Sequence, residues 1–160
     1  MRLEHHLHDL IAKRASDYVG VLRELVAIPS VLGDEGAVQA RVKDHLRGLG
    51  VVAREVFPET KPPFVPSGRC YEGRPCIVGR ILGRGNRHFI LNAHADTAPV
   101  EDPNSWTHAP FAAEIADGKL FGRGALDDKA GLAMLLLIAE CLRKADARSE
   151  ERRVGKECRL

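Results

Sequence analysis

A glycine-rich acidic segment that leads directly into the longest apolar stretch is the feature that most constrains how this chain folds. The segment reads GRGALDDKAG over residues 122–131, and the apolar stretch occupies residues 132–139. Because the stretch is far too short to cross a membrane, it predicts a helix packed into a protein core. One acid at the start of such a helix is enough to cap its free N–H groups and to face the positive end of its dipole. Two acids stand there, Asp127 and Asp128.

Length and composition favour one domain with a real core. The chain has 160 residues, of which 44% are hydrophobic and 29% charged, so disorder is not expected. Its 24 basic residues nearly balance its 22 acidic ones, so neither nucleic acid nor an anionic membrane surface is a predicted partner. The N-terminus, MRLEHHLHDL, has no apolar secretory core, and the 4 cysteines show no CxxC spacing. We therefore expect a cytoplasmic protein with reduced thiols.

Helix and strand signals alternate along the chain. Apolar residues at helical spacing predict one helix that stops near Pro29 and another between residues 34 and 50. These apolar positions are Tyr18, Val21, Leu22, Leu25 and Val26 in the first helix, and Val38, Val42, Leu46 and Leu49 in the second. Strands are predicted over residues 51–57, 76–82 and 88–93, the last two as a hairpin of buried strands, and a loop over 58–75. A second hairpin is predicted around Asp117-Gly118. This mixture predicts a layered α/β fold with a mixed sheet between helices.

The first candidate for chemistry follows the apolar stretch 88–93, in the sequence LNAHADTAPV. In an extended chain, the side chains of His94 and Asp96 point the same way. A metal-binding imidazole normally donates its other ring N–H to a carboxylate, which fixes its tautomer, and Asp96 could orient His94 in this manner. A loop histidine followed by an aspartate turn explains the same residues, and from this short pattern alone it is the preferred interpretation.

The acidic segment allows two interpretations. Either acid can act only as a helix cap, or Asp127 faces a functional site while Asp128 caps the helix or contacts a substrate. The neighbouring Arg123 and Lys129 would then contact a substrate carboxylate or pair with the two acids. The glycines do not form a nucleotide-binding loop, because no GK[ST] follows them and the GxGxxG spacing is absent.

Taken together, these segments resemble a known family. The matching motifs are HADTAPV at 94–100, SWTHAPF at 105–111 and GKLFGRGALDDKAG at 118–131, with weaker support from LRELVAIPSV at 22–31. They resemble the co-catalytic zinc metallohydrolases and metallopeptidases that include acetylornithine deacetylase, succinyl-diaminopimelate desuccinylase, aminoacylase and glutamate carboxypeptidase. The resemblance implies a layered zinc-exopeptidase-like fold, of which residues 1–147 would be the N-terminal part of the catalytic domain.

The resemblance also implies a metal site. His94 would bind one ion, Asp96 would be the catalytic residue that orients His94, and Asp127 would bridge two divalent metal ions, zinc or else cobalt or manganese. A shared carboxylate offsets the repulsion of two ions roughly 3.5 to 4 Å apart. The family often has a cis peptide bond after the bridging aspartate, here between Asp127 and Asp128. The substrate-binding residues stay unknown.

The implied activity is hydrolysis of the amide bond of an N-acyl amino acid, a small-molecule substrate, by a full-length protein that could be a homodimer. A dipeptidase or carboxypeptidase acting on short peptides is one alternative, because Asp128 stands where many deacylases of the family have methionine. A non-catalytic truncated fragment with weak metal binding is another. The family's catalytic glutamate, a neighbouring metal-binding glutamate and two later metal ligands lie C-terminal to the matched region.

The C-terminal end of the chain has a different character. Residues 148–158, RSEERRVGKEC, match the conceptual translation of a common sequencing-library adapter. Residues 148–160 are therefore expected to be a non-native tail. Glu150 and Glu151 are not interpreted as the family's glutamate pair, because no apolar strand precedes them.

Overall fold

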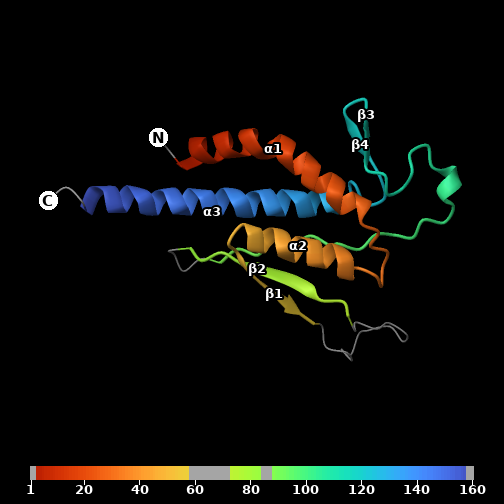
Figure 1. Ribbon diagram of the computed structural model, residues 1–160, viewed down its shortest axis with the longest axis horizontal. Coiled ribbons are helices and arrows are strands. Elements are labelled where there is room, and N and C mark those ends of the chain that lie inside the picture. The colour runs from red at the N-terminus through yellow and green to blue at the C-terminus, as the bar shows by residue number, and fades with distance from the viewer. Residues whose placement is uncertain (1–2, 58–72, 84–87, 158–160) are drawn as a thin grey trace.

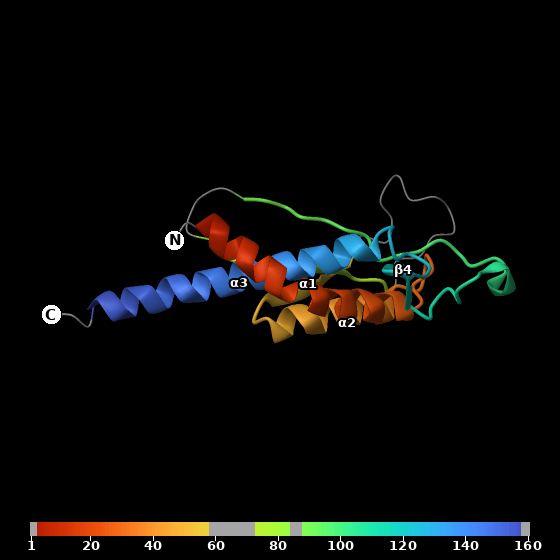
Figure 2. The same ribbon diagram turned by 90° about the horizontal axis from the view of Figure 1, so that it is seen from above.

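Helices form the body of the molecule. The computed structural model describes residues 3–57, 73–83 and 88–157 (Figure 1). The helices α1 (Leu3–Ala27) and α3 (Lys129–Glu157) lie side by side and run in opposite directions, and α2 (Gly36–Gly48) packs beside α3 (Figures 1 and 2). Within the described ranges, none of the helices has the length and hydropathy that a membrane crossing needs.

The first two helices confirm the predictions from apolar spacing. In α1, Tyr18 and Leu25 are buried against the rest of the core, and the helix ends just before Pro29, which disfavours helical backbone in the residue that precedes it. At the end of α2, Gly50 takes a left-handed φ of 71°, and the N–H of Val51 reaches back to the carbonyl of Leu46 at 2.9 Å. This is a Schellman termination, which a glycine at this position favours.

The helix α3 begins at Lys129, immediately after the acid pair, as predicted. It is not buried on every side, however. Its apolar residues divide into a face that packs into the core, represented by Leu132 and Leu136, and a face exposed to solvent that carries Met134 and Ile138. Beyond residue 147, the segment expected to be a non-native tail continues the helix to Glu157.

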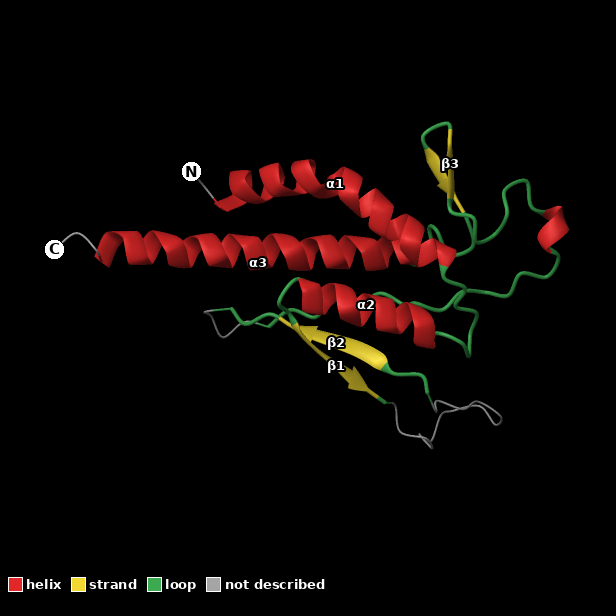
Figure 3. Ribbon diagram, in the orientation of Figure 1, coloured by secondary structure: helices red, strands yellow, loops and turns green. Residues whose placement is uncertain are grey.

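The sheet pairing differs from the prediction. The strand β1 (Val52–Val56) pairs antiparallel with β2 (Cys76–Arg80), in a register that runs from Val52 opposite Arg80 to Val56 opposite Cys76. This two-stranded sheet lies against α2 (Figure 3). The predicted hairpin of 76–82 with 88–93 is therefore wrong, and so is the prediction that 88–93 is a buried strand. Apolar character made 88–93 strand-like, but a strand exists only where a neighbour accepts its backbone hydrogen bonds.

The second predicted hairpin is confirmed. The strands β3 (Glu114–Ala116) and β4 (Lys119–Phe121) pair antiparallel around Asp117 and Gly118, whose φ angles are 50° and 73°. Two successive positive φ values are typical of the type I′ turn that an Asp-Gly pair favours. A short 3-10 helix, η1 (Pro103–Ser105), lies in the long loop before β3.

The α/β class is confirmed, with small sheets beside packed helices. The described strands form two antiparallel pairs rather than the single mixed sheet expected. Outside these strands, an isolated parallel bridge joins Val31 and Thr97. Most of the predicted loop at 58–75, together with Cys70 and Cys158, lies outside the described residues. Cys76 and Cys141 are free thiols.

Candidate metal centre

The two motif segments meet through a histidine and an aspartate. His94 Nε2 lies 2.9 Å from Asp127 Oδ1, although 33 residues separate them in the sequence. His94 follows the extended segment 88–93, whereas Asp127 lies in the turn that precedes α3. The side chain of Asp127 is 87% exposed and that of His94 is 47% exposed, so both are open to solvent. The structure therefore brings together the two residues predicted as metal ligands.

Asp96 lies beside the other ring nitrogen of His94. His94 Nδ1 is 3.0 Å from the backbone carbonyl oxygen of Asp96 and 3.4 Å from its carboxylate Oδ1. The predicted orienting residue is thus in place, but the closer partner is its main chain. An imidazole that donates from Nδ1 keeps Nε2 available as a ligand, which is the tautomer that a metal at Nε2 requires.

The electrostatics of the pair follow from this geometry. The hydrogen bond with Asp127 raises the pKa of His94, and the contacts with Asp96 act in the same direction, while partial burial opposes them. A protonated ring holds two donors and satisfies both neighbours at once. A proton and a metal ion compete for the same nitrogen, so a metal ion that binds His94 would displace this proton.

The imidazole of His94 and the carboxylate of Asp127 are donor types that suit a divalent metal ion, but they supply only part of a coordination shell. Imidazole nitrogen and carboxylate oxygen are ordinary zinc ligands, and a carboxylate has a second oxygen with which to bridge. Zinc sites in proteins use at least three side-chain ligands. Across the described ranges, no group of three or more His, Cys, Asp or Glu side chains converges on one point.

Asp128 is turned away from this pair. The peptide bond between Asp127 and Asp128 is cis, as the resemblance implied. The carboxylate of Asp128 lies so close over Gly131 that a Cβ at residue 131 would collide with it. The Asp128 carbonyl oxygen accepts the N–H of Leu132 at 3.0 Å, within the first turn of α3. Gly131 is therefore needed for the side chain of Asp128 to fold onto the helix.

The basic residues of this segment have partners that the sequence did not suggest. Lys129 is fully buried and its Nζ donates to the carbonyl of Ile28 at 2.7 Å, which places it out of reach of a substrate. Arg123 donates to the carbonyl of Pro99 at 3.2 Å, and its guanidinium lies 4.8 Å from the ring centroid of Trp106. Both residues join loops around the site.

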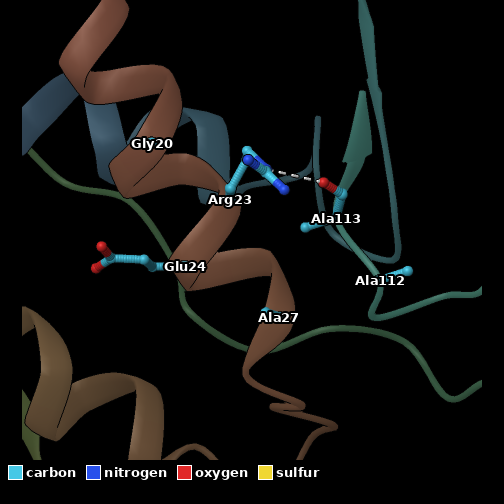
Figure 4. A pocket seen from close by; sticks show the side chains of 6 residues that line it. All are labelled: Gly20, Arg23, Glu24, Ala27, Ala112 and Ala113. Carbon is cyan, nitrogen blue, oxygen red and sulfur yellow. Dashed lines mark hydrogen bonds between the residues drawn. The ribbon is translucent and has the colours of Figure 1, made fainter. Parts of the chain in front are cut away.

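A shallow cleft of about 360 Å³ lies elsewhere, between α1 and the segment before β3. Figure 4 shows that its wall includes Arg23, whose Nε donates to the carbonyl of Ala113 at 3.2 Å. His94, Asp96 and Asp127 do not line it. The candidate metal centre is thus an exposed meeting point of two loops, apart from this cleft.

Comparison with known proteins agrees with the motifs. Residues 90–154 match the family described as peptidase family M20/M25/M40. The chain is 34% identical over 119 residues to a succinyl-diaminopimelate desuccinylase of Methylorubrum extorquens, covering 74% of this chain and 28% of that protein. A succinyl-diaminopimelate desuccinylase of Cereibacter sphaeroides is 36% identical over 124 residues, covering 77% and 29%. The chain thus spans less than a third of the length of these relatives.

Solved structures agree on the fold. The chain superposes on human carnosine dipeptidase 1 with a TM-score of 0.69 and 22% identity, covering 91% of this chain and 32% of that one. The dipeptidase Dug1p of Saccharomyces cerevisiae gives a TM-score of 0.65 and 21% identity, covering 89% and 31%. The chain therefore shares the fold of these two dipeptidases over about 90% of its length. Over residues 90–154 the chain is similar to the peptidase family M20/M25/M40, in agreement with its desuccinylase relatives.

Proposed function

We propose that the whole protein hydrolyses the amide bond of an N-acyl amino acid and uses two divalent metal ions, zinc or else cobalt or manganese. The observation that carries this proposal is the contact of 2.9 Å between His94 Nε2 and Asp127 Oδ1. It joins two motifs that are distant in the sequence, at a point open to solvent. The names of the relatives support the same reaction, since they are desuccinylases.

The residues of this chain have separate parts in the proposed site. His94 and Asp127 would hold the metal ions, and Asp96 holds the imidazole of His94 at Nδ1 through its main-chain carbonyl. When bound, the ions supply Lewis-acid activation of the amide and of the attacking water. The position of His94 and Asp127 at the ends of an extended segment and a tight turn limits their freedom before a metal arrives, which favours a defined geometry.

The proposed substrate class is a small N-acyl amino acid, with an N-succinyl group suggested by the relatives. A dipeptidase is the second candidate, and Asp128 is the residue that favours it, because it carries an acid where many deacylases have methionine. In either case, the substrate is a small molecule and not a nucleic acid or a membrane. We also propose a cytoplasmic location, and a homodimer as a candidate state of the whole protein.

The 160-residue chain by itself is proposed to bind a metal weakly and to lack hydrolytic activity. Two converging ligands are too few for a complete zinc site. Titration of the purified chain with Zn²⁺, followed by calorimetry, should show weak binding that disappears in the His94→Ala variant. Hydrolysis by this chain that a chelator abolishes would contradict this part of the proposal.

The activity itself is tested in the whole protein. N-succinyl amino acids, N-acetyl amino acids and dipeptides are offered in turn, before and after chelation and after return of zinc, cobalt or manganese. We expect hydrolysis of an N-acyl amino acid that chelation abolishes and a metal restores. Hydrolysis confined to dipeptides would favour the second candidate, and hydrolysis insensitive to chelation would contradict both.

The bridging role of Asp127 is tested by the Asp127→Ala variant of the whole protein. Removal of the carboxylate should abolish metal-dependent turnover, because nothing else at that position can neutralise two adjacent ions. Asp44→Ala, which removes an exposed acid of α2, is the matched control and should retain full activity. Substantial turnover by the Asp127→Ala variant would contradict the bridging role of Asp127.

A further inference from the structure

The turn at residues 28–32, just after α1, is bonded to the segment that carries His94. The hydroxyl of Ser30 donates to the carbonyl of Ala95 at 2.7 Å. The N–H of Thr97 donates to the carbonyl of Ser30 at 2.8 Å, and the N–H of Leu32 donates to the carbonyl of Thr97 at 3.2 Å. Ser30, Ala95 and Thr97 are all buried. Water therefore does not compete for these bonds, and the backbone on the C-terminal side of His94 is held to the turn.

The same turn is also bonded to the segment that carries Asp127. Lys129, two residues further along, donates from Nζ to the carbonyl of Ile28 at 2.7 Å. This carbonyl follows the last residue of α1, where the negative end of the helix dipole favours a cation. The side chain of Lys129 is 0% exposed, and burial lowers its pKa to about 8.

Within the part of the chain that the structure describes, no carboxylate pairs with the buried ammonium of Lys129, and a charge buried in this way is a costly means of stabilising a fold. Burying a charge costs free energy that hydrogen bonds only partly offset, and an apolar side chain of similar length fills the same space without that cost. What an apolar side chain does not provide is a directed bond to the carbonyl of Ile28. The contact therefore points to a requirement for position rather than for stability.

We propose that Ser30 and Lys129 are positioning residues, which tie the two ligand-bearing segments to the same turn and thereby set the separation of His94 and Asp127. Ser30 holds the His94 side and Lys129 holds the Asp127 side. The importance of this separation for catalysis rests on the proposed function, whereas the separation itself is a property of this chain.

The packing of Gly124 shows how closely the two segments are held. A Cβ at this position would lie 2.5 Å from Thr97 Cγ2 and 3.6 Å from Lys129 Cδ. The backbone of the acidic segment thus rests directly on the residue bonded to Ser30 and on the stem of Lys129. The two segments are therefore in close contact at Gly124, and we expect the loss of a bond to the turn to increase their separation.

The test compares four variants of the 160-residue chain. Lys129→Met keeps the length of the side chain and removes the ammonium, and Ser30→Ala removes one hydroxyl. Their matched controls are Lys144→Met, which changes a half-exposed lysine of the same helix, and Ser105→Ala, which removes an exposed hydroxyl that also donates to a backbone carbonyl, at 2.8 Å. The readouts are the thermal midpoint, the crystallographic distance between His94 Nε2 and Asp127 Oδ1, and Zn²⁺ affinity.

We expect Lys129→Met and Ser30→Ala to fold, to lose the hydrogen bond between His94 and Asp127, and to bind Zn²⁺ about tenfold more weakly, as for other residues that orient metal ligands. Both controls should retain the bond. Retention of the 2.9 Å contact in folded Lys129→Met and Ser30→Ala overturns the inference. If Lys129→Met does not fold, the smaller change in Ser30→Ala decides the matter. If the unmodified chain binds no Zn²⁺ but the variants lose the contact, the positioning role holds and the proposed weak metal binding by this chain fails.

Discussion

At the scale of single residues, the candidate site depends on glycines at two positions where a side chain would collide with its neighbours. Gly124 has a φ of 79°, and its missing Cβ leaves room for Thr97. Gly131 leaves room for the carboxylate of Asp128. These glycines allow a tight turn to lie on a buried segment, so that the acids reach the surface while the chain behind them is packed.

Gly124→Ala should therefore destabilise the chain. A left-handed φ is unfavourable for alanine, and the new methyl group would collide with Thr97 in a packed environment, which together cost about 2 to 4 kcal/mol. Gly20→Ala is the matched control, because Gly20 lies within α1 and a Cβ there meets nothing within 4 Å. The control should stabilise the chain by about 0.5 to 1 kcal/mol. Urea unfolding measures both changes, and equal effects of the two variants would contradict the packing argument.

The sequence predicts the residues of the site better than the bonds that hold them. His94, Asp96 and Asp127 are predicted from the resemblance of their motifs to a known family, whereas their short pattern alone favours a loop histidine and a helix cap. The bonds made by Ser30 and Lys129 are not predictable from the sequence. Each side chain donates to a backbone carbonyl, and because every residue has a carbonyl, the residue type of the acceptor gives no signal. The signal that could have found Lys129 is its place at the entrance to an apolar helix, where a lysine must either reach solvent or find a buried acceptor.

At the scale of elements, a polar cluster joins the three helices. Tyr18 of α1 donates its hydroxyl to the carbonyl of Leu136 in α3 at 3.3 Å, and the same oxygen lies 3.1 Å from Nε2 of His45 in α2. In α3, the buried Glu140 accepts a hydrogen bond from Nη2 of Arg14 at 3.3 Å, and its other carboxylate oxygen lies 3.0 Å from Nε of Arg14. This cluster fixes how the helices are aligned, because directed bonds specify relative position more narrowly than apolar packing does.

Glu140→Gln should weaken the packing of α1 on α3. Burial by itself raises the pKa of Glu140, but hydrogen bonds with Lys144, Tyr18 and Arg14 outweigh it, so that the pKa lies below its ordinary value. The carboxylate is therefore charged, and its replacement should cost about 1 to 3 kcal/mol. Glu24→Gln, at the exposed pair with Arg41, should cost about 1 kcal/mol or less. Urea denaturation measures the loss of unfolding free energy in each variant. Equal losses in Glu140→Gln and Glu24→Gln would show that burial of the carboxylate is unimportant.

His45 should make the stability of the chain fall on mild acidification. Burial lowers its pKa, and the charge of Arg41 lowers it further, so the folded protein holds this ring neutral below its ordinary pKa of 6.5. The unfolded chain then binds a proton that the folded chain does not, and the free energy of unfolding decreases as the pH falls below that value. The effect is absent above it, where both states are neutral.

The measurement is urea unfolding of the unmodified chain and of His45→Gln at about pH 7.5 and about pH 5.5. The other histidines are present in both proteins, so the difference between the two proteins isolates His45. The variant should lose less stability than the unmodified chain on acidification. An equal loss would show that His45 does not stay neutral in the fold.

Sequence signals between neighbouring residues predict individual helices and the tight hairpin, but they do not predict which strands pair across a long connection. The helices α1 and α2 and the hairpin of β3 and β4 were predicted because periodicity, termination and an Asp-Gly turn are properties of neighbouring residues. The pairing of β1 with β2 joins strands on either side of a long connection, and the apolar segment 88–93 looked equally suitable as a partner. Choice between such partners depends on the packing of α2, which the strands do not encode.

At the scale of the whole molecule, the described surface is unusually apolar in one segment. Phe89 is 86% exposed and Ile90 is 92% exposed, and Leu91 beside them is also exposed. Three consecutive exposed apolar residues in an extended segment expose both apolar area and backbone groups, and that combination promotes association.

We therefore expect the isolated 160-residue chain to self-associate. The double variant Phe89→Ser and Ile90→Thr should shift the population toward monomer, whereas Ile11→Ser, at a single exposed apolar residue of α1, should not. Sedimentation equilibrium over a range of concentrations measures this shift. A monomer at all concentrations, or equal behaviour of the two variants, would contradict the expectation.

The turn at residues 28–32 also bears on the order in which the molecule is built. Synthesis proceeds from the N-terminus, so α1 and this turn leave the ribosome before the residues that bond to them. The segment after His94 arrives next and finds Ser30 in place, and Lys129 arrives last with the start of α3. The turn that positions the site is therefore synthesised before His94 and Asp127, the two residues that it positions.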